Sequence, residues 1–453
     1  MDLKSVNKVY FLGIGGIGMS ALARYFLAKG AAVFGYDKIP SAITDKLTEE
    51  GAVIHFDDEP AKIPTDIELA IYTPAIPKNQ EEYKYLKNSD FTFIKRAEAL
   101  GLLSENTPTI AVAGTHGKTT VSCFLAHILK TADFDFYAFL GGLCTNYNSN
   151  FIHNGKPDWF LIEADEFDRS FLNLKPEMAV ITAMDPDHLD VYNNKTELIN
   201  NFMAFCEKVK PGGKLIMKNG LQKPESVNRE FFNYHVEENS DLYAENIRIN
   251  NGYYYADFHG LINQQNVKIG LPGRHNLENA LAASMLAYHL GIDKNVIVEA
   301  LASFKGVKRR FEICFKNDNK VYIDDYAHHP EEIKACINAA KELYPGKRIL
   351  SVFQPHLYSR TRDFAEDFAK ALSITDEVIL LDIYPARELP IEGVNSEMIL
   401  NLIENDSKSI VAKQQLTDTL NNKEFDVLIT MGAGDIDRLV GPVTSMMQKK
   451  FSA

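Results

Sequence analysis

The segment at residues 114–120 has the composition of a phosphate-binding loop. It contains Gly-Thr-His-Gly-Lys-Thr-Thr between a predicted strand and a predicted helix. Glycines let backbone amides approach phosphate oxygens, a lysine adds positive charge, and a threonine hydroxyl can bind Mg²⁺. A full-length loop of this type has a glycine where this chain has Val112, so the motif is a shortened form. The segment predicts an ATP site made of Gly114, Thr115, His116, Gly117, Lys118, Thr119 and Thr120.

Acidic residues follow two further predicted strands in this region. Glu163 comes directly after the apolar strand 159–162, which is where phosphate-loop proteins place a metal-binding acid. An exposed acidic loop explains the other acids of the segment, which are Asp165, Glu166 and Asp168. His188 lies among carboxylates after the predicted strand 178–182, and this favours a second metal or phosphate contact over a structural histidine.

A second glycine-rich segment lies near the start of the chain. The spacing Gly-x-Gly-x-x-Gly follows the predicted strand 9–12, at Gly13, Gly15 and Gly18. Asp37 ends the following strand, which completes the fingerprint of loops whose amides hold a dinucleotide diphosphate. Any diphosphate fits this physics, so the pattern predicts a phosphate role and leaves the nucleotide open. A glycine-rich turn that only packs a helix on a sheet is the alternative.

Further polar clusters occur in the second half of the chain. The cluster at 272–280 contains Asn276, which could cap the following helix or contact the edge of an adenine. Two more clusters follow predicted strands, where open α/β sheets bind ligands, and they include Asp324, Tyr326, His328, His329, His356 and Arg360. A zinc site formed by the three histidines is an alternative, but no Cys or Glu-x-x-His pattern supports it.

Hydrophobic periodicity predicts an α/β protein in which strands alternate with helices. The predicted strands lie at 9–12, 32–36, 52–55, 69–73, 91–94, 159–162, 178–182, 321–324, 348–353, 377–381 and 427–430. Residues 240–270 have a β-hairpin pattern, which predicts a small sheet added to the middle of the chain. A helix is predicted at 277–290, and the polar segments 104–108 and 305–310 are predicted linkers.

Length and composition narrow the class of protein. A chain of 453 residues predicts about three domains. The net charge of −13 argues against a nucleic-acid coat or an anionic-membrane binder, because both need a basic surface. The five cysteines include no CxxC pair, so no zinc knuckle or disulfide framework is predicted. The absence of a signal-peptide pattern and of a long apolar run predicts a cytoplasmic protein.

Together these motifs resemble those of the Mur ligases, the ATP-dependent amide-forming enzymes of peptidoglycan synthesis. The segments that carry the resemblance follow family order across nearly the whole chain, at 12–23, 113–120, 163–172, 185–192, 271–283, 308–312, 324–332 and 353–364. The set is specific, whereas the Gly-x-Gly-x-x-Gly spacing alone is not.

The resemblance implies three domains. They are a Rossmann-like UDP-sugar-binding domain at 1–106, a central P-loop ATPase domain with the small added sheet at 107–303, and a Rossmann-like amino-acid-binding domain at 304–453. The implied reaction joins L-alanine to the lactyl carboxylate of UDP-N-acetylmuramate through an acyl phosphate, with ATP and Mg²⁺. The implied partners are these small molecules, with no nucleic acid and no membrane, and the chain would be a monomer or a homodimer.

The resemblance also assigns roles to individual residues. The UDP-sugar would contact Gly13, Gly15, Gly16, Ile17, Gly18, Asp37 and Thr73. ATP would contact the central loop and also His275, Asn276, Arg310 and Asp324, and the metal would be held by Thr119, Glu163 and His188. The amino-acid region would be lined by Tyr326, His328, His356 and Arg360. The implied catalytic residues are Lys118, His188, His328 and Arg360, with the base left open between His328 and His356.

Three alternatives remain at this point. A ligase that attaches a recycled murein tripeptide to the same acceptor shares the ATP and UDP-sugar motifs. An NAD-dependent dehydrogenase would explain the first glycine loop and Asp37 but not the loop at 114–120, and a P-loop ATPase without ligation would explain only the latter. Leu357 stands where many family members have Arg, which leaves any substrate contact there open.

Overall fold

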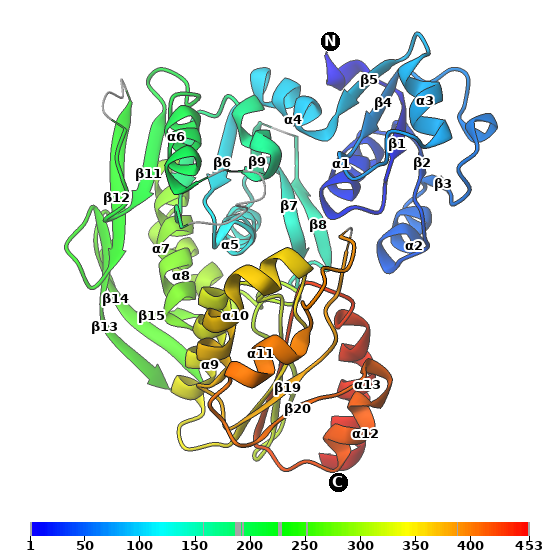
Figure 1. Cartoon of the computed structure of the whole chain (residues 1–453). Coiled ribbons are helices and arrows are strands. Elements are labelled where there is room, and N and C mark those ends of the chain that lie inside the picture. Colours follow the sequence, from blue (N-terminus) through cyan, green and yellow to red (C-terminus); the bar gives the residue numbers. More distant parts are fainter. Residues whose placement is uncertain are drawn as a thin grey trace. The chain divides into compact units, whose positions relative to one another are not determined.

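The computed structural model describes residues 2–156, 158–185, 192, 194–224, 229–250, 252–386 and 388–451 (Figure 1). The chain folds as two compact units. The first contains Met1–Ile247, Ala256–Lys268 and Glu278–Lys305, and the second contains Arg248–Tyr255, Ile269–Leu277 and Gly306–Ala453. The positions predicted for the domain boundaries, 106 and 304, remain predictions.

The N-terminal part of the first unit is a five-stranded parallel sheet of order β3-β2-β1-β4-β5. Its strands are β1 (Lys8–Leu12), β2 (Ala32–Tyr36), β3 (Val53–His55), β4 (Leu69–Tyr72) and β5 (Thr92–Lys95). Its helices are α1 (Ile17–Ala28), α2 (Ala42–Glu49), α3 (Glu81–Lys87) and α4 (Arg96–Glu105), with short 3-10 turns η1 (Leu3–Ser5) and η2 (Pro60–Lys62). The strand order reverses between β1 and β4, and ligands of such sheets bind at this switch point.

Most of a ten-stranded sheet forms the remainder of the first unit, and its order is β15-β14-β13-β12-β11-β10-β6-β9-β7-β8. Residues 248–250, 253–255 and 269 of its outer strands belong to the second unit. The strands of this sheet are β6 (Thr109–Ala113), β7 (Phe136–Cys144), β8 (Ser149–Asn154), β9 (Trp159–Glu163), β10 (Met178–Ile181), β11 (Lys214–Lys218), β12 (Glu230–Val236), β13 (Leu242–Asn250), β14 (Tyr253–Gly260) and β15 (Gln264–Ile269). The helical elements of this part are α5 (Lys118–Thr131), η3 (Phe167–Asn173), α6 (Lys195–Cys206), α7 (Arg274–His289) and α8 (Lys294–Ser303), and the first turn of α7, residues 274–277, belongs to the second unit. The strands expected near 240–270 are present, and hydrogen bonding joins them in series to the central sheet.

One hydrophobic cluster connects the two sheets of the first unit, because α1 contributes to both. Tyr25 on α1 packs its ring 5.6 Å from Phe139 and 6.1 Å from Phe160 of the central sheet. The linker expected at 104–108 is shorter than predicted. Ser104 is buried in the last turn of α4, and its hydroxyl donates to the Gly101 carbonyl at 2.7 Å, so the helix accommodates this polar residue.

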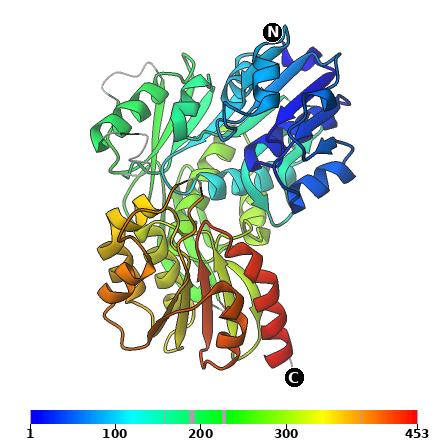
Figure 2. The ribbon, with the colours of Figure 1, turned by 45° about the vertical axis from the view of Figure 1, so that its right-hand side comes forward.

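The second unit is a six-stranded sheet of order β16-β17-β21-β18-β19-β20 with helices on both faces (Figure 2). Its strands are β16 (Glu312–Lys316), β17 (Val321–Asp325), β18 (Ile349–Phe353), β19 (Glu377–Leu380), β20 (Lys408–Ile410) and β21 (Val427–Met431). Its helical elements are α9 (Pro330–Leu343), α10 (Tyr358–Leu372), α11 (Ser396–Leu402), η4 (Lys413–Gln415), α12 (Leu416–Asn421) and α13 (Asp437–Phe451). All strands but β16 run parallel, so the loops after β17, β18 and β21 meet at one edge.

The sheets therefore follow the α/β pattern that hydrophobic periodicity predicts. The ends of the predicted strands differ from the observed ends by no more than one residue. Across the described ranges, no helix combines the length and the apolar character needed to cross a membrane.

Candidate active site

The loop at 114–120 connects β6 to α5, and its glycines are required by packing. Gly114 has φ of +136°, and a Cβ there would lie 2.1 Å from Thr182 Oγ1. Gly117 has φ of +83° and caps α5, and a Cβ there would lie 2.5 Å from Asn279 Oδ1. Both φ values fall in the left-handed region that side chains disfavour, so glycine is needed on two grounds. Asn279 was not predicted as a site residue, because no sequence spacing connects it to this loop.

Lys118 opens α5 and forms a buried ion pair with Glu166. Its Nζ donates to Glu166 Oε2 at 2.6 Å and to Oε1 at 2.9 Å, and also to the Gly114 carbonyl at 2.6 Å. Burial by itself lowers the pKa of Lys118, but the nearby carboxylates, chiefly Glu166 and Asp165, outweigh it and raise this pKa. Glu166 is fully buried, so the interpretation of this residue as part of an exposed acidic loop is wrong. Asp165 is half-buried and Asp168 is exposed.

Thr119 and Glu163 form an oxygen-rich pair beside Lys118. The Thr119 hydroxyl donates to Glu163 Oε1 at 2.9 Å, and the Gly141 amide donates to Glu163 Oε2 at 2.9 Å. Burial raises the pKa of Glu163, although Lys118 acts in the opposite direction. A hydroxyl and a half-buried carboxylate are suitable donors for Mg²⁺, which prefers oxygen ligands. No group of three or more His, Cys, Asp or Glu side chains is placed to hold a metal in the described ranges.

The rest of the loop is anchored to the strand end at β10. The Thr115 amide donates to the Ala183 carbonyl at 3.1 Å, and the Thr182 hydroxyl donates to the His116 carbonyl. Thr115 Oγ1 accepts from the Asp185 amide at 3.0 Å, and Thr120 is buried in the first turn of α5. His188, predicted as a metal ligand and catalytic residue, lies outside the described residues.

The N-terminal glycine loop lies at the switch point between β1 and β4, as the strand order requires. Gly13 has φ of +88°, and a Cβ there would lie 2.7 Å from Thr73 Cγ2, so these two predicted residues are in contact. The Gly15 amide donates to Asp37 Oδ2 at 2.7 Å. Gly16 caps α1, and the chain enters the helix at Ile17. The structure thus brings the predicted diphosphate-binding residues together.

Arg96 supplies a positive charge to this loop that the sequence analysis missed. A Cβ built on Gly18 would lie 2.2 Å from Arg96 Nη1, so the guanidinium lies against the first turn of α1. A cation at a helix N-terminus is disfavoured by the helix dipole unless an anion is nearby. Asp165 lies 3.6 Å from Arg96 Nη2 and compensates in part. A diphosphate at this position would satisfy the guanidinium and the helix amides together.

In the second unit, Asp324 is the centre of a buried network. Arg309 Nε donates to Asp324 Oδ2 at 3.0 Å, and the Thr430 hydroxyl donates to Oδ1 at 2.6 Å. Burial raises the pKa of Asp324 to about 6, with Arg309 opposing the shift. The adjacent Asp325 accepts from the Phe311 amide at 2.6 Å, and burial raises its pKa to about 6 as well. The predicted contact of Asp324 with nucleotide stays a prediction, and Arg309 is the partner that the sequence analysis did not identify.

Predicted amino-acid-binding residues cluster at the carboxyl edge of this sheet. The rings of Tyr326 and His328 are 5.1 Å apart, and those of His328 and His356 are 6.2 Å apart. Tyr384, which was not predicted, stacks on His356 at 5.8 Å. His328 Nδ1 lies 3.0 Å from the Tyr326 carbonyl. A carbonyl can only accept, so this contact assigns the proton to Nδ1 and leaves Nε2 as the basic nitrogen.

Charged side chains frame this aromatic cluster. The guanidinium of Arg310 lies 5.2 Å from the Tyr326 ring centre and 3.5 Å from Glu332 Oε1. Arg360 lies in the first turn of α10. This helix begins directly after Leu357, whose φ is +68°.

Helix α7 begins at Arg274, so Asn276 lies inside the helix and is not its cap. The Nδ2 of Asn276 donates to the Pro272 carbonyl at 2.6 Å. His275 is exposed.

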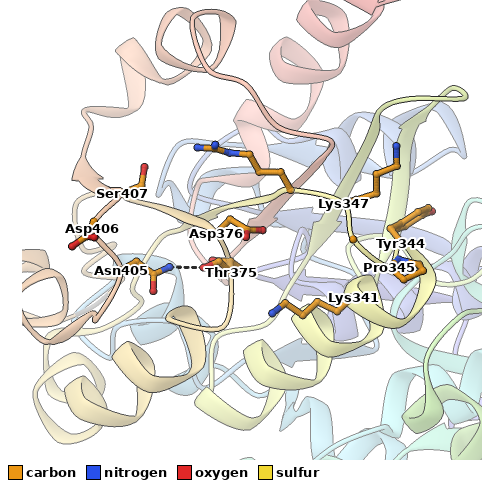
Figure 3. A pocket seen from close by; sticks show the side chains of 11 residues that line it. Lys341, Tyr344, Pro345, Lys347, Thr375, Asp376, Asn405, Asp406 and Ser407 are labelled. Carbon is orange, nitrogen blue, oxygen red and sulfur yellow. Dashed lines mark hydrogen bonds between the residues drawn. The ribbon is translucent and has the colours of Figure 1, made fainter.

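A cavity of about 930 Å³ lies at the other edge of the same sheet (Figure 3). Its lining includes Lys341, Lys347, Arg348, Asp376 and Asp406. Arg348 and Asp376 precede β18 and β19, so the cavity is at the amino ends of these strands. It is therefore separate from the residues that the motifs bring together.

A phosphate loop after a parallel strand, a second glycine loop at a switch point and a polar strand-end cluster define an α/β nucleotide-binding protein of several sheets. Three family models match this arrangement in order. They are "Mur ligase family, catalytic domain" at residues 8–107, "Mur ligase middle domain" at 112–287 and "Mur ligase, glutamate ligase domain" at 309–434. Together with the whole-chain relatives described next, they show that the chain belongs to the Mur ligase family.

Relatives match over the full length. The chain is 49% identical to a UDP-N-acetylmuramate–L-alanine ligase of Flavobacterium psychrophilum, covering 99% of this chain and 100% of that one. It is 47% identical to the ligase of the same name from Porphyromonas gingivalis, covering 98% and 99%. Among solved structures, the UDP-N-acetylmuramate–alanine ligase of Thermotoga maritima matches with a TM-score of 0.84 at 28% identity, covering 98% and 99%. A murein peptide ligase of Psychrobacter arcticus shares the fold, with a TM-score of 0.69 at 22% identity and coverage of 97% and 98%.

Proposed function

We propose that this protein is an ATP-dependent ligase that joins L-alanine to the lactyl carboxylate of UDP-N-acetylmuramate. The observation that carries the proposal is the convergence of Lys118, Thr119 and Glu163 on the loop after β6. This arrangement is suited to a nucleoside triphosphate. The names of the full-length relatives support the choice of acceptor and amino acid. ATP and UDP-sugars are cytoplasmic metabolites, so we place the enzyme in that compartment.

The first step activates a poor electrophile. A carboxylate resists attack by an amine, so the lactyl carboxylate first attacks the γ-phosphorus of ATP and forms an acyl phosphate with release of ADP. Lys118 stabilises the charge on the transferring phosphoryl group, and loop amides hold the other phosphates. Bound Mg²⁺ supplies further charge neutralisation, and Thr119 and Glu163 are the residues that would hold it.

The second step forms the amide bond. The amine of L-alanine must lose a proton to attack the acyl carbon, and inorganic phosphate then leaves. We assign the base to His328, because its contact with the Tyr326 carbonyl leaves Nε2 as the basic nitrogen. Arg360 and His356 remain candidates for contacts with the alanine carboxylate and the acyl phosphate. Water must be excluded, since it would hydrolyse the acyl phosphate.

Phosphate release tests this proposal directly. Purified protein is incubated with ATP, Mg²⁺ and UDP-N-acetylmuramate, together with L-alanine or with the murein tripeptide. We expect phosphate release that depends on both the acceptor and L-alanine. Activity with the tripeptide alone would instead favour the recycling ligase, and ATP hydrolysis independent of both substrates would favour an ATPase without ligation. The dehydrogenase alternative predicts NAD binding and leaves the loop at 114–120 without a role.

A further inference from the structure

The three N–H donors of the Lys118 ammonium are all directed at protein acceptors. They meet the Gly114 carbonyl at 2.6 Å and the two carboxylate oxygens of Glu166 at 2.6 and 2.9 Å. An ammonium group has three donors and no more. A phosphate oxygen can therefore receive a hydrogen bond from Lys118 only after one of these contacts is lost.

Glu166 is held firmly in the position that makes this contact. The residue is fully buried, and its backbone carbonyl accepts from the Tyr192 hydroxyl at 2.5 Å and from the Arg169 amide at 2.9 Å. The Lys118 side chain is 13% exposed, so the pair is shielded from water and its attraction is little screened. A flexible surface acid would compete weakly with a phosphate, whereas this fixed and desolvated carboxylate competes strongly.

A carboxylate is also a chemical stand-in for a phosphate at this position. Both present paired anionic oxygens that accept charge-assisted hydrogen bonds. Glu166 thus gives Lys118 the partner that the β- or γ-phosphate of ATP would otherwise provide.

We propose that Glu166 is the resident counter-ion of Lys118, that the phosphates of ATP displace it, and that it thereby sets the affinity of the loop for ATP. The inference rests on the proposed function, because it takes 114–120 as the ATP loop. On binding, Lys118 exchanges a carboxylate oxygen for a phosphate oxygen, and no covalent bond changes. Glu166 is a positioning residue: it keeps the ammonium at the loop at the cost of weaker nucleotide binding.

The test measures affinity for a non-hydrolysable ATP analogue, AMP-PNP with Mg²⁺, by calorimetry on the full chain. Glu166→Gln keeps the shape of the side chain but removes the charge that holds Lys118. We expect it to bind the analogue about tenfold more tightly than wild type, the size of one charge-assisted hydrogen bond. Most site mutations weaken binding, so the sign of this change separates displacement from a merely structural role.

Asp165→Asn is the matched control. It removes the same charge one residue away, from a half-buried side chain whose Oδ1 accepts from the Phe167 amide at 3.1 Å. We expect a change in affinity of at most about twofold, because partly exposed charges are well screened. A gain equal to that of Glu166→Gln would show that general repulsion, and not the Lys118 contact, limits binding, and would overturn the proposal.

Two further variants keep the test decisive. Glu166→Asp retains the charge but shortens the side chain, and an intermediate gain is expected even where Glu166→Gln folds poorly. In a Lys118→Gln background, Glu166→Gln should change affinity by less than about twofold, because the coupling acts through the ammonium. Equal or weaker binding by folded Glu166→Gln overturns this inference alone. Absence of nucleotide binding by the wild type overturns the proposed function and this inference with it.

Discussion

The two glycine loops of the first unit use the same backbone device but obtain their charge differently. The loop at 114–120 carries its own cation, Lys118, which is bound to the buried Glu166. The loop at 13–18 contains no cation, and the guanidinium of Arg96 reaches it from the start of α4. In both loops a carboxylate of the protein already accepts a hydrogen bond from a group that would bind phosphate. Glu166 accepts from the Lys118 ammonium, and Asp37 accepts from the Gly15 amide.

This difference indicates two binding regimes. An ammonium bound to a buried carboxylate must exchange partners before it can bind a phosphate. At the central loop, Glu166 and the phosphates of ATP therefore compete for Lys118. At the N-terminal loop, the guanidinium has five donors and its contact with Asp165 is long, at 3.6 Å, so a diphosphate can be added with little rearrangement. We therefore expect substitutions at the two loops to affect different ligands and, in one case, with opposite sign.

The largest expected effect is that of Lys118→Ala. Loss of the ammonium removes the charge that stabilises phosphoryl transfer, so ligation should fall by about a thousandfold or more. Binding of UDP-N-acetylmuramate, measured by calorimetry, should change by less than about threefold, because the sugar loop is separate. Removing one partner of a buried pair can destabilise the fold. The control is the double variant Lys118→Ala with Glu166→Gln, which leaves no unpaired carboxylate at position 166. An equal loss of ligation and of UDP-N-acetylmuramate binding would contradict two separate sites.

Gly114→Ala compared with Gly16→Ala contrasts one constrained and one unconstrained glycine of the two loops. At Gly114 an alanine would adopt φ of +136° and place Cβ 2.1 Å from Thr182 Oγ1, so we expect a loss of about 2–5 kcal/mol in unfolding free energy. At Gly16 the φ is −61° and the nearest atom, the Gly13 carbonyl oxygen, is 3.5 Å from the Cβ position. That substitution should change stability by at most about 0.5 kcal/mol. Urea unfolding measures the stability of both variants. Equal costs would mean that the left-handed φ and the close contact at Gly114 carry no energetic penalty.

Arg96→Ala tests whether the remote cation serves the N-terminal loop. Loss of a charge-assisted contact should weaken UDP-N-acetylmuramate binding about tenfold and leave ATP affinity within about twofold. Lys95→Ala is the matched control, since it removes a neighbouring exposed cation that lies 3.8 Å from Asp168. An effect of Lys95→Ala as large as that of Arg96→Ala would point to general electrostatics and not to contact at Gly18.

These partners also mark the limit of prediction from sequence. Both loops could be located because glycine spacing, a preceding strand and a following helix are local patterns. The position of Glu163 beside Thr119 could be predicted because Glu163 follows an apolar strand, and its role as a metal ligand stays a prediction. Arg96, Asn279 and Glu166 could not be predicted, because no spacing in the sequence connects them to the glycine loops that the fold brings them to. Glu166 was misjudged since an acid within an acidic segment suggests exposure, whereas its ion pair with Lys118 compensates for its burial. Arg309 was missed for the same reason, as one of several cations in a row.

The smallest expected effect comes from Asp37→Asn, which is the same carboxylate-to-amide change as Glu166→Gln on the other loop. Asp37 accepts from the Gly15 amide at 2.7 Å and from the Lys38 amide at 2.8 Å, so it orders the loop and restrains no cation. An asparagine oxygen can still accept from Gly15, and loss of the negative charge reduces repulsion of a diphosphate. We therefore expect the affinity for UDP-N-acetylmuramate to stay within about threefold of wild type, because these effects oppose each other. A loss above tenfold would instead indicate a direct contact with the ligand, such as a ribose hydroxyl. A gain as large as that expected for Glu166→Gln would mean that both loops are limited by competition, and the contrast between them would be lost.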